Sequence, residues 1–191
     1  PVLALNRTDE VLPASGGALV QLSLAPEEEA ATLAEVAYGA DNRAAMLSAP
    51  ASAWGEKGER ALRTRWNEVG GYVVRAAASG DREDYSRGVK DALGLSASEQ
   101  RARTVRDMLA TNIECTARRR QDPDVVFLLA ADGEQARAIK PLLAFHYAGA
   151  LPVYTLSSVY SGIPDERNRD LNGINLVEIP WLLGASPELR V

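Results

Sequence analysis

The chain has 191 residues, of which 46% are hydrophobic and 25% charged, and its formal net charge is −5. This length allows one good hydrophobic core or two very small ones, and the composition excludes a disordered or fibrous chain. The excess of acidic residues argues against binding that depends on neutralising phosphates, so no nucleic-acid partner is expected.

The single cysteine, Cys115, cannot form a disulfide within the chain, and we expect it to be a buried free thiol. No cluster of cysteine and histidine has metal-ligand spacing, so the sequence predicts no metal and no other cofactor. The sequence contains no signal peptide and no apolar run of membrane-spanning length. Because the chain opens abruptly on strand-like residues, we expect an excised fragment whose targeting segment has been removed.

Two short strands are predicted at the start, over residues 1–5 and 19–24. The polar connector over residues 7–17 holds Pro13 and the pair Gly16-Gly17. This composition indicates a hinge or an interdomain passage.

Pro26 is typical of a first helical position, and the three glutamates after it favour a helix that Gly39 ends. Strands are then predicted over residues 44–48 and 72–76. Apolar residues at helical spacing predict a helix between them, over residues 58–69.

Residues 81–93 have a polar helical pattern, and a longer helix is predicted around Ser96 and Glu99, which have capping-box spacing. The run of three arginines at 118–120 is predicted to complement the dipole at the C-terminal end of this helix, with a phosphate or lipid patch as the alternative. The inner face of the helix is predicted to consist of Val105, Met108, Leu109, Asn112, Ile113 and Thr116.

A strand-helix-strand unit forms the centre of the predicted fold. The unbroken apolar run over residues 125–129 is typical of a strand buried on both faces, as in parallel sheets. Asp132 can cap the helix that follows, and Pro141 inside this helix removes a backbone amide and is expected to kink it. A strand over residues 151–156 completes the unit, with a right-handed crossover.

A surface loop is predicted over residues 159–171 and a last strand over 173–180. Trp181 follows with apolar neighbours, which suggests contact with another domain or a partner. Because strands and helices alternate along the chain, the predicted fold class is α/β, with a three-layer parallel sheet.

Polar and small residues at the ends of the predicted strands could line a cleft for a small ligand or an anion. The residues of this possible cleft are Ser48, Ser52, Trp54, Asp132, Ser157 and Ser158. The sequence at 55–58 invites a phosphate-loop interpretation, but neither glycine fingerprint of phosphate-binding loops occurs, and simple loop packing is the alternative.

No residue pattern predicts catalysis. His146 is the only histidine, and its place near the end of an amphipathic helix is typical of a core or boundary residue. The nucleophile-elbow pattern Gly-x-Ser-x-Gly is absent, and acidic pairs such as Asp165 with Glu166 lie in polar stretches where solvation explains them. We therefore expect a protein that is not an enzyme and has no catalytic residues.

Several segments, taken in order, resemble one known family. They are residues 124–130, the sequence Ile139-Lys140-Pro141-Leu142, the strand ending in Ser157-Ser158 and residues 173–180, with agreement also at 1–6, 22–30, Trp66 and Gly70-Gly71. Their order and spacing resemble the C-terminal domain of the LppC/LpoA family of outer-membrane lipoproteins over nearly the whole chain. Residues 81–121 show no clear match.

The resemblance implies one lobe of a type 1 periplasmic-binding-protein-like fold. Residues 1–17 would be the end of the first lobe and the crossover, 18–180 the second lobe, and 181–191 a tail that returns toward the first lobe.

The resemblance also implies a regulator of peptidoglycan synthesis that activates a class A penicillin-binding protein by direct contact and is not itself an enzyme. Its expected location is the periplasmic face of the outer membrane, reached through a lipid anchor that this sequence lacks. The surface that meets the partner is expected to include Tyr160, Arg167 and Trp181.

A periplasmic receptor for an amino-acid-like solute is the alternative, because the same fold closes on amino acids or small amides. The ammonium and carboxylate groups of such a ligand need hydroxyls, amides and an acid at strand ends. The residues of the possible cleft could supply part of this set. An enzyme is the third and least favoured of the functions considered for this chain.

Overall fold

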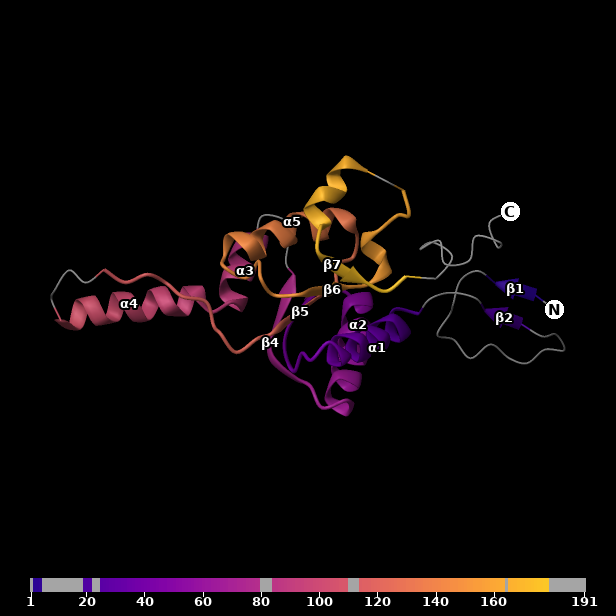
Figure 1. Ribbon diagram of the computed structural model, residues 1–191, viewed down its shortest axis with the longest axis horizontal. Coiled ribbons are helices and arrows are strands. Elements are labelled where there is room, and N and C mark those ends of the chain that lie inside the picture. Colours follow the sequence, from indigo (N-terminus) through magenta and orange to yellow (C-terminus); the bar gives the residue numbers. More distant parts are fainter. Residues whose placement is uncertain are drawn as a thin grey trace.

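The computed structural model describes residues 2–4, 19–21, 25–79, 84–109, 114–163 and 165–178. Its centre is a five-stranded sheet in the order β4-β3-β5-β6-β7, in which every neighbouring pair is parallel. The strands are β3 (Ala44–Pro50), β4 (Tyr72–Ser79), β5 (Val125–Leu128), β6 (Val153–Thr155) and β7 (Ile174–Leu176). A separate parallel pair lies away from this sheet (Figure 1), namely β1 (Val2–Ala4) and β2 (Leu19–Gln21).

Helices cover both faces of the five-stranded sheet and so form three layers (Figure 1). On one face lie α1 (Pro26–Gly39) and α2 (Ala53–Glu68), and on the other lie α3 (Tyr85–Ala92) and α5 (Gly133–Phe145). Each face has its own cluster of buried apolar side chains. The predicted α/β class with a three-layer parallel sheet is confirmed.

The central strands supply alternate residues to the two clusters. Along β3, Ala45 and Leu47 pack with α1 and α2, whereas Met46 packs with α3 and α5. Every residue of β5 is buried, which explains the unbroken apolar run of its sequence. Each fully buried side chain of this size stabilises the fold by about 1.5–3 kcal/mol.

Trp66 is the largest fully buried side chain and joins α2 to the sheet. Its ring centroid lies 5.1 Å from that of Phe127 at 79°, the edge-on geometry that aromatic pairs prefer. The indole Nε1 donates to the carbonyl of Tyr72 at 3.0 Å, so its one polar atom is satisfied. A Cβ on Gly71 would come within 2.2 Å of the Trp66 ring, which makes glycine necessary there.

Asp124 holds the amino ends of β3 and β5 together. Its carboxylate accepts hydrogen bonds from the amides of Arg43 and Ala44, both at 2.9 Å. β4, the next strand along the chain, pairs with one edge of β3, and β5, which follows β4 in the chain, pairs with the other edge of β3. The carboxyl ends of β3 and β5 are therefore the topological switch point, where open α/β sheets bind ligands.

α4 (Leu95–Leu109) departs from the predicted packing. It projects away from the sheet (Figure 1), and Leu95 alone among its residues is buried. The predicted inner face is wrong at the positions that the structure describes, all of which are exposed: Val105, Met108, Leu109 and Thr116. Asn112 and Ile113 lie outside the described residues.

The segment 114–122 returns along α4. The amide of Arg120 donates to the carbonyl of Leu93, and the amide of Arg118 donates to Ser98 Oγ. The three arginines therefore lie beside the N-terminal end of α4, and the predicted pairing with its C-terminal dipole is wrong. The prediction of a buried thiol is also wrong, because Cys115 is exposed.

The stretch predicted as a surface loop contains the last residue of the 3-10 helix η2 (Ser157–Val159) and all of the 3-10 helix η3 (Glu166–Leu171). β7 is shorter than the predicted strand, and residues 179 and 180 lie outside the described part. Pro141 lies inside α5, as the sequence predicts. Within the described ranges, no helix combines the length and apolar character needed to cross a membrane.

Candidate functional site

The residues of the possible cleft lie along one edge of the sheet, where the carboxyl ends of β3, β5 and β6 meet. Ser52 comes directly before α2, Asp132 directly before α5, and Ser157 and Ser158 form the start of η2. Because the three strands are parallel neighbours, the fold brings these segments to the same edge. What each side chain contacts decides whether they form one site.

Ser52 and Asp132 both cap helices. The side chain of Ser52 accepts from the amide of Gly55 at 3.1 Å, and Asp132 Oδ1 accepts from the amide of Gln135 at 2.8 Å. Gln135 Oε1 in turn accepts from the amide of Ala131 at 2.7 Å, which completes a reciprocal cap at the start of α5. These bonds satisfy amides that the first turns leave unpaired.

Residues 55–58 lie in the first turns of α2, which begins at Ala53, and so they do not form a loop. Gly55 has a structural role: a Cβ there would come within 2.2 Å of the carbonyl oxygen of Pro50. The glycine allows the helix to start directly against the end of β3.

Ser157 is bound by a buried carboxylate that sequence reasoning missed. Its amide donates to Glu29 Oε2 at 2.8 Å and its hydroxyl donates to Glu29 Oε1 at 3.0 Å. Glu29 lies in the first turn of α1 and is only 5% exposed. Burial raises the pKa of the Glu29 carboxyl, the two bonds from Ser157 oppose this rise, and the charge of Glu178 adds to it.

The remaining residues of the possible cleft point to different layers. Ser158 Oγ donates to the carbonyl of Ala130 at 2.7 Å and so ties η2 to the end of β5. Ser48 lines a hollow of about 30 Å³ between the sheet and α3, on the same face as Met46. Trp54 packs against the cluster on the opposite face, with α1 and α2.

The edge therefore holds the predicted residues without gathering them around one cavity. Ser52, Asp132, Ser157 and Ser158 each make an intrachain hydrogen bond that supports a helix or a turn. Any ligand at this edge would have to compete with these bonds. Over the described ranges, no group of three or more metal-ligating side chains comes together.

A hollow of about 220 Å³ does lie at the start of α5, between Tyr85 and Asp132. Its polar groups are engaged with one another, since Gln135 Nε2 donates to the Tyr85 hydroxyl at 3.3 Å. The possible cleft as a binding site stays a prediction.

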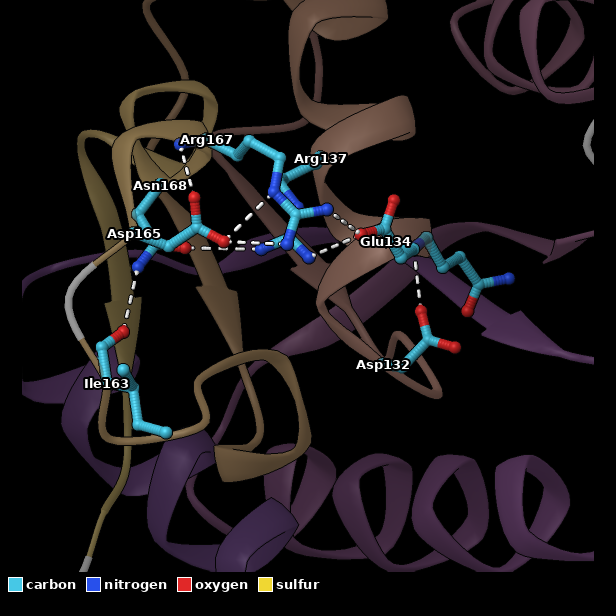
Figure 2. A network of polar contacts seen from close by, with 8 residues as sticks. Asp132, Glu134, Arg137, Ile163, Asp165, Arg167 and Asn168 are labelled. Carbon is cyan, nitrogen blue, oxygen red and sulfur yellow. Dashed lines mark hydrogen bonds and ion pairs between the residues drawn. The ribbon is translucent and has the colours of Figure 1, made fainter.

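Arg167, expected on the partner surface, belongs to an ion-pair network between η3 and α5 (Figure 2). Its guanidinium donates to Asp165 Oδ2 at 2.7 Å and to Glu134 Oε1 at 2.8 Å. Glu134 Oε1 also accepts from Arg137 Nη2 at 2.9 Å, and Arg137 Nη1 donates to Asn168 at 3.1 Å. The hydrogen bond from Arg167 lowers the pKa of the Asp165 carboxyl, so the network stays charged.

The other two residues of the expected partner surface differ in how far the structure describes them. Tyr160 directly follows η2 and is half-buried. Trp181 lies outside the described residues. The partner surface formed by Tyr160, Arg167 and Trp181 stays a prediction.

His146 has the environment of a boundary residue. Its side chain is buried at the end of α5, and its Nε2 lies 3.4 Å from the Ser86 hydroxyl. Burial, with a smaller effect of the positive charge of Lys90, lowers the pKa of the imidazole. This arrangement favours a neutral ring that packs between α3 and α5.

Sequence comparison connects the whole chain to one family. The family model described as "LppC putative lipoprotein" matches residues 1–191. A protein named penicillin-binding protein activator LpoA from Vibrio antiquarius is 29% identical over 192 residues, and one of the same name from Dickeya chrysanthemi is 24% identical over 204 residues. The alignments cover 99% and 98% of this chain, but only 31% and 30% of those relatives, so the chain spans about a third of their length.

Solved structures show the same fold. The C-domain of LpoA from Haemophilus influenzae, described as a regulator of PBP1A, superposes with a TM-score of 0.59 at 16% identity, over 97% of this chain and 52% of that one. A putative branched-chain amino acid ABC transporter protein from Chromobacterium violaceum superposes with a TM-score of 0.63 at 24% identity, over 98% of this chain and 50% of that one. The predicted periplasmic-binding-protein-like lobe is therefore confirmed as the fold class.

Proposed function

This chain belongs to the LppC putative lipoprotein family, and we propose that it is the non-enzymatic part of an activator that contacts a class A penicillin-binding protein. The observation that carries the proposal is the match of the family model and of the named activators along the full chain. Activation would work by docking on the synthase and favouring its active conformation.

The geometry of the sheet edge supports an interaction role over solute binding. An amino-acid receptor needs hydroxyls, amides and an acid aimed at the ligand, but here these groups cap helices or bind one another. The ABC transporter protein resembles this chain in fold, and a shared fold does not assign a substrate to this chain. Solute binding is therefore the alternative function that the experiment has to exclude.

The proposal includes the arrangement of the whole protein. Residues 18–180 would be the second lobe, 1–17 the end of the first lobe and the crossover, and 181–191 a tail that returns toward the first lobe. A lipid anchor in the outer membrane would hold the protein on the periplasmic side, in reach of a synthase. The family's description as lipoproteins supports this placement.

A binding experiment separates the two functions. The 191-residue chain, shown to be folded by circular dichroism, is titrated against the periplasmic part of each class A penicillin-binding protein of the host by biolayer interferometry. In parallel, its melting temperature is measured with a panel of amino acids, since a tight ligand raises the melting temperature of the folded state. Saturable synthase binding without an amino-acid effect supports the activator, and the reverse pattern supports the receptor.

A further inference from the structure

The projecting part of the molecule carries its own charge. We define the arm as α4 together with the returning segment 114–122, which extends from the body beside α3 (Figure 1). Between residues 95 and 122 the sequence has six arginines and four acidic residues, whereas the whole chain has a net charge of −5. The arm thus has a formal net charge of +2, and the rest of the chain has a net charge of −7.

Four of the six arginines of the arm border a hollow of about 400 Å³ between α4 and the returning segment, and Asp122 also lines it. Arg119 and Arg120 are fixed within the fold: Arg119 Nε donates to the carbonyl of Tyr147 at 2.7 Å, and Arg120 forms an ion pair with Asp122 at 2.5 Å. We call the hollow bordered by Arg101, Arg118, Arg119 and Arg120 the arginine groove.

Among the residues that the structure describes, two guanidinium groups of the arginine groove have no intrachain partner. Arg101 and Arg118 are both exposed, and no carboxylate of the described residues forms an ion pair with either side chain. Fixed arginines beside such a pair make a preorganised surface, because the planar guanidinium forms two parallel hydrogen bonds to a carboxylate.

The outer end of α4 adds apolar area next to these charges. Val105 is 42% exposed and Met108 79% exposed, on a helix of which Leu95 alone is buried. Arginine and methionine are enriched in protein interfaces, and an apolar contact ringed by charged groups is the usual composition of a docking site.

Building on the proposed function, we propose that the arm is a docking element for the synthase in addition to the expected surface at Tyr160, Arg167 and Trp181, with the arginine groove binding an acidic surface of the class A penicillin-binding protein. The charge difference between arm and body orients the approach, since the body at −7 repels the same acidic surface. An anionic membrane is the less suitable occupant, because Asp107 and Glu114 are exposed toward the outer end of the arm and would face the headgroups.

The test compares two variants of equal charge. Arg101→Glu with Arg118→Glu changes the net charge from −5 to −9 within the arginine groove. Arg60→Glu with Arg75→Glu makes the same change at exposed positions of α2 and β4. A milder pair, Arg101→Ala with Arg118→Ala, serves if the reversed charges disturb folding, which circular dichroism and the melting temperature of each variant report.

Affinity for the periplasmic part of the synthase is measured by biolayer interferometry at low and high salt. The proposal predicts at least about a tenfold loss for the groove variant, about unchanged affinity for the control, and wild-type affinity that falls with salt. Equal affinity of the groove variant and wild type would overturn the docking role of the arm while the proposed function stands. Failure of the wild type to bind any class A synthase would overturn both.

A membrane role is measured with vesicles containing phosphatidylglycerol. If the wild type binds the vesicles, the groove variant does not, and both bind the synthase alike, the groove is a lipid surface and the proposed acidic protein partner is wrong. Absence of vesicle binding together with the tenfold loss for the synthase supports the proposal.

Discussion

Replacing the buried carboxylate Glu29 by glutamine is predicted to remove a pH dependence from the stability of the fold. Burial raises the folded-state pKa of Glu29 above its ordinary value of 4.5, so the folded chain holds this proton more tightly than the unfolded chain does. The stability that the protonated form contributes is complete below pH 4.5 and is lost as the pH rises through the raised folded pKa. Glutamine cannot take part in this titration.

The size of the effect follows from the two bonds to Ser157. A glutamine at position 29 can accept from the Ser157 amide and donate to its hydroxyl, so both contacts remain without a buried charge. At neutral pH we therefore expect Glu29→Gln to be equal to the wild type or up to about 1 kcal/mol more stable. Glu29→Ala leaves the Ser157 amide without its acceptor and should cost about 1–3 kcal/mol.

The assay is urea unfolding, followed by tryptophan fluorescence, of the wild type, both Glu29 variants and the control Glu27→Gln. The control removes a carboxylate from the same turn of α1. We expect the wild type and the control to lose stability from acid to neutral pH relative to Glu29→Gln. Parallel pH profiles for the wild type and Glu29→Gln would refute the role given to burial of this carboxylate.

Three further substitutions, one of them with a matched control, test the packing and the expected partner surface. Trp66→Ala should lower the free energy of unfolding by about 3–5 kcal/mol in urea, because the side chain is fully buried against the sheet. Gly71→Ala should lower the free energy of unfolding by about 1–3 kcal/mol, since its Cβ would meet the Trp66 ring at 2.2 Å. The control Gly39→Ala, whose Cβ would meet no atom within 4 Å, should be neutral or stabilising. Equal effects of the two substitutions would contradict the steric argument. Arg167→Ala should leave the circular dichroism spectrum unchanged and weaken activation of the synthase, and normal activation by this variant would place the interface elsewhere.

The alternation of strands and helices could be predicted because each element carries a local signal. The apolar run of β5 indicates burial on both faces, and Pro26 and Asp132 mark the first turns of α1 and α5. These signals depend only on neighbours in the sequence, and the structure confirms them.

The arm could not be predicted, since an apolar spacing along a helix is the same whether that face is packed or exposed. Val105 and Met108 have the spacing of a buried face, yet α4 leaves the body and exposes both. The predicted location of the arginine run, at the C-terminal end of α4, is wrong for a related reason. The sequence gives no sign that residues 114–122 turn back to the beginning of α4.

The contacts at the sheet edge are also long-range. In the sequence, Glu29 is already accounted for as an acidic residue in a first helical turn, where it complements the helix dipole. Nothing nearby in the sequence therefore indicates its hydrogen bond to a serine 128 positions away. The sequence places the hydroxyls of the possible cleft at strand ends, but their intrachain partners depend on how the strands assemble.

The most direct test of the central claim is the rate of peptidoglycan cross-linking by the host's class A penicillin-binding protein, measured with and without the folded 191-residue chain. The account predicts a saturable increase in cross-linking that the groove variant Arg101→Glu with Arg118→Glu loses and the control variant Arg60→Glu with Arg75→Glu keeps. No change in cross-linking for any class A synthase of the host, with a melting temperature that rises on addition of an amino acid, would contradict it.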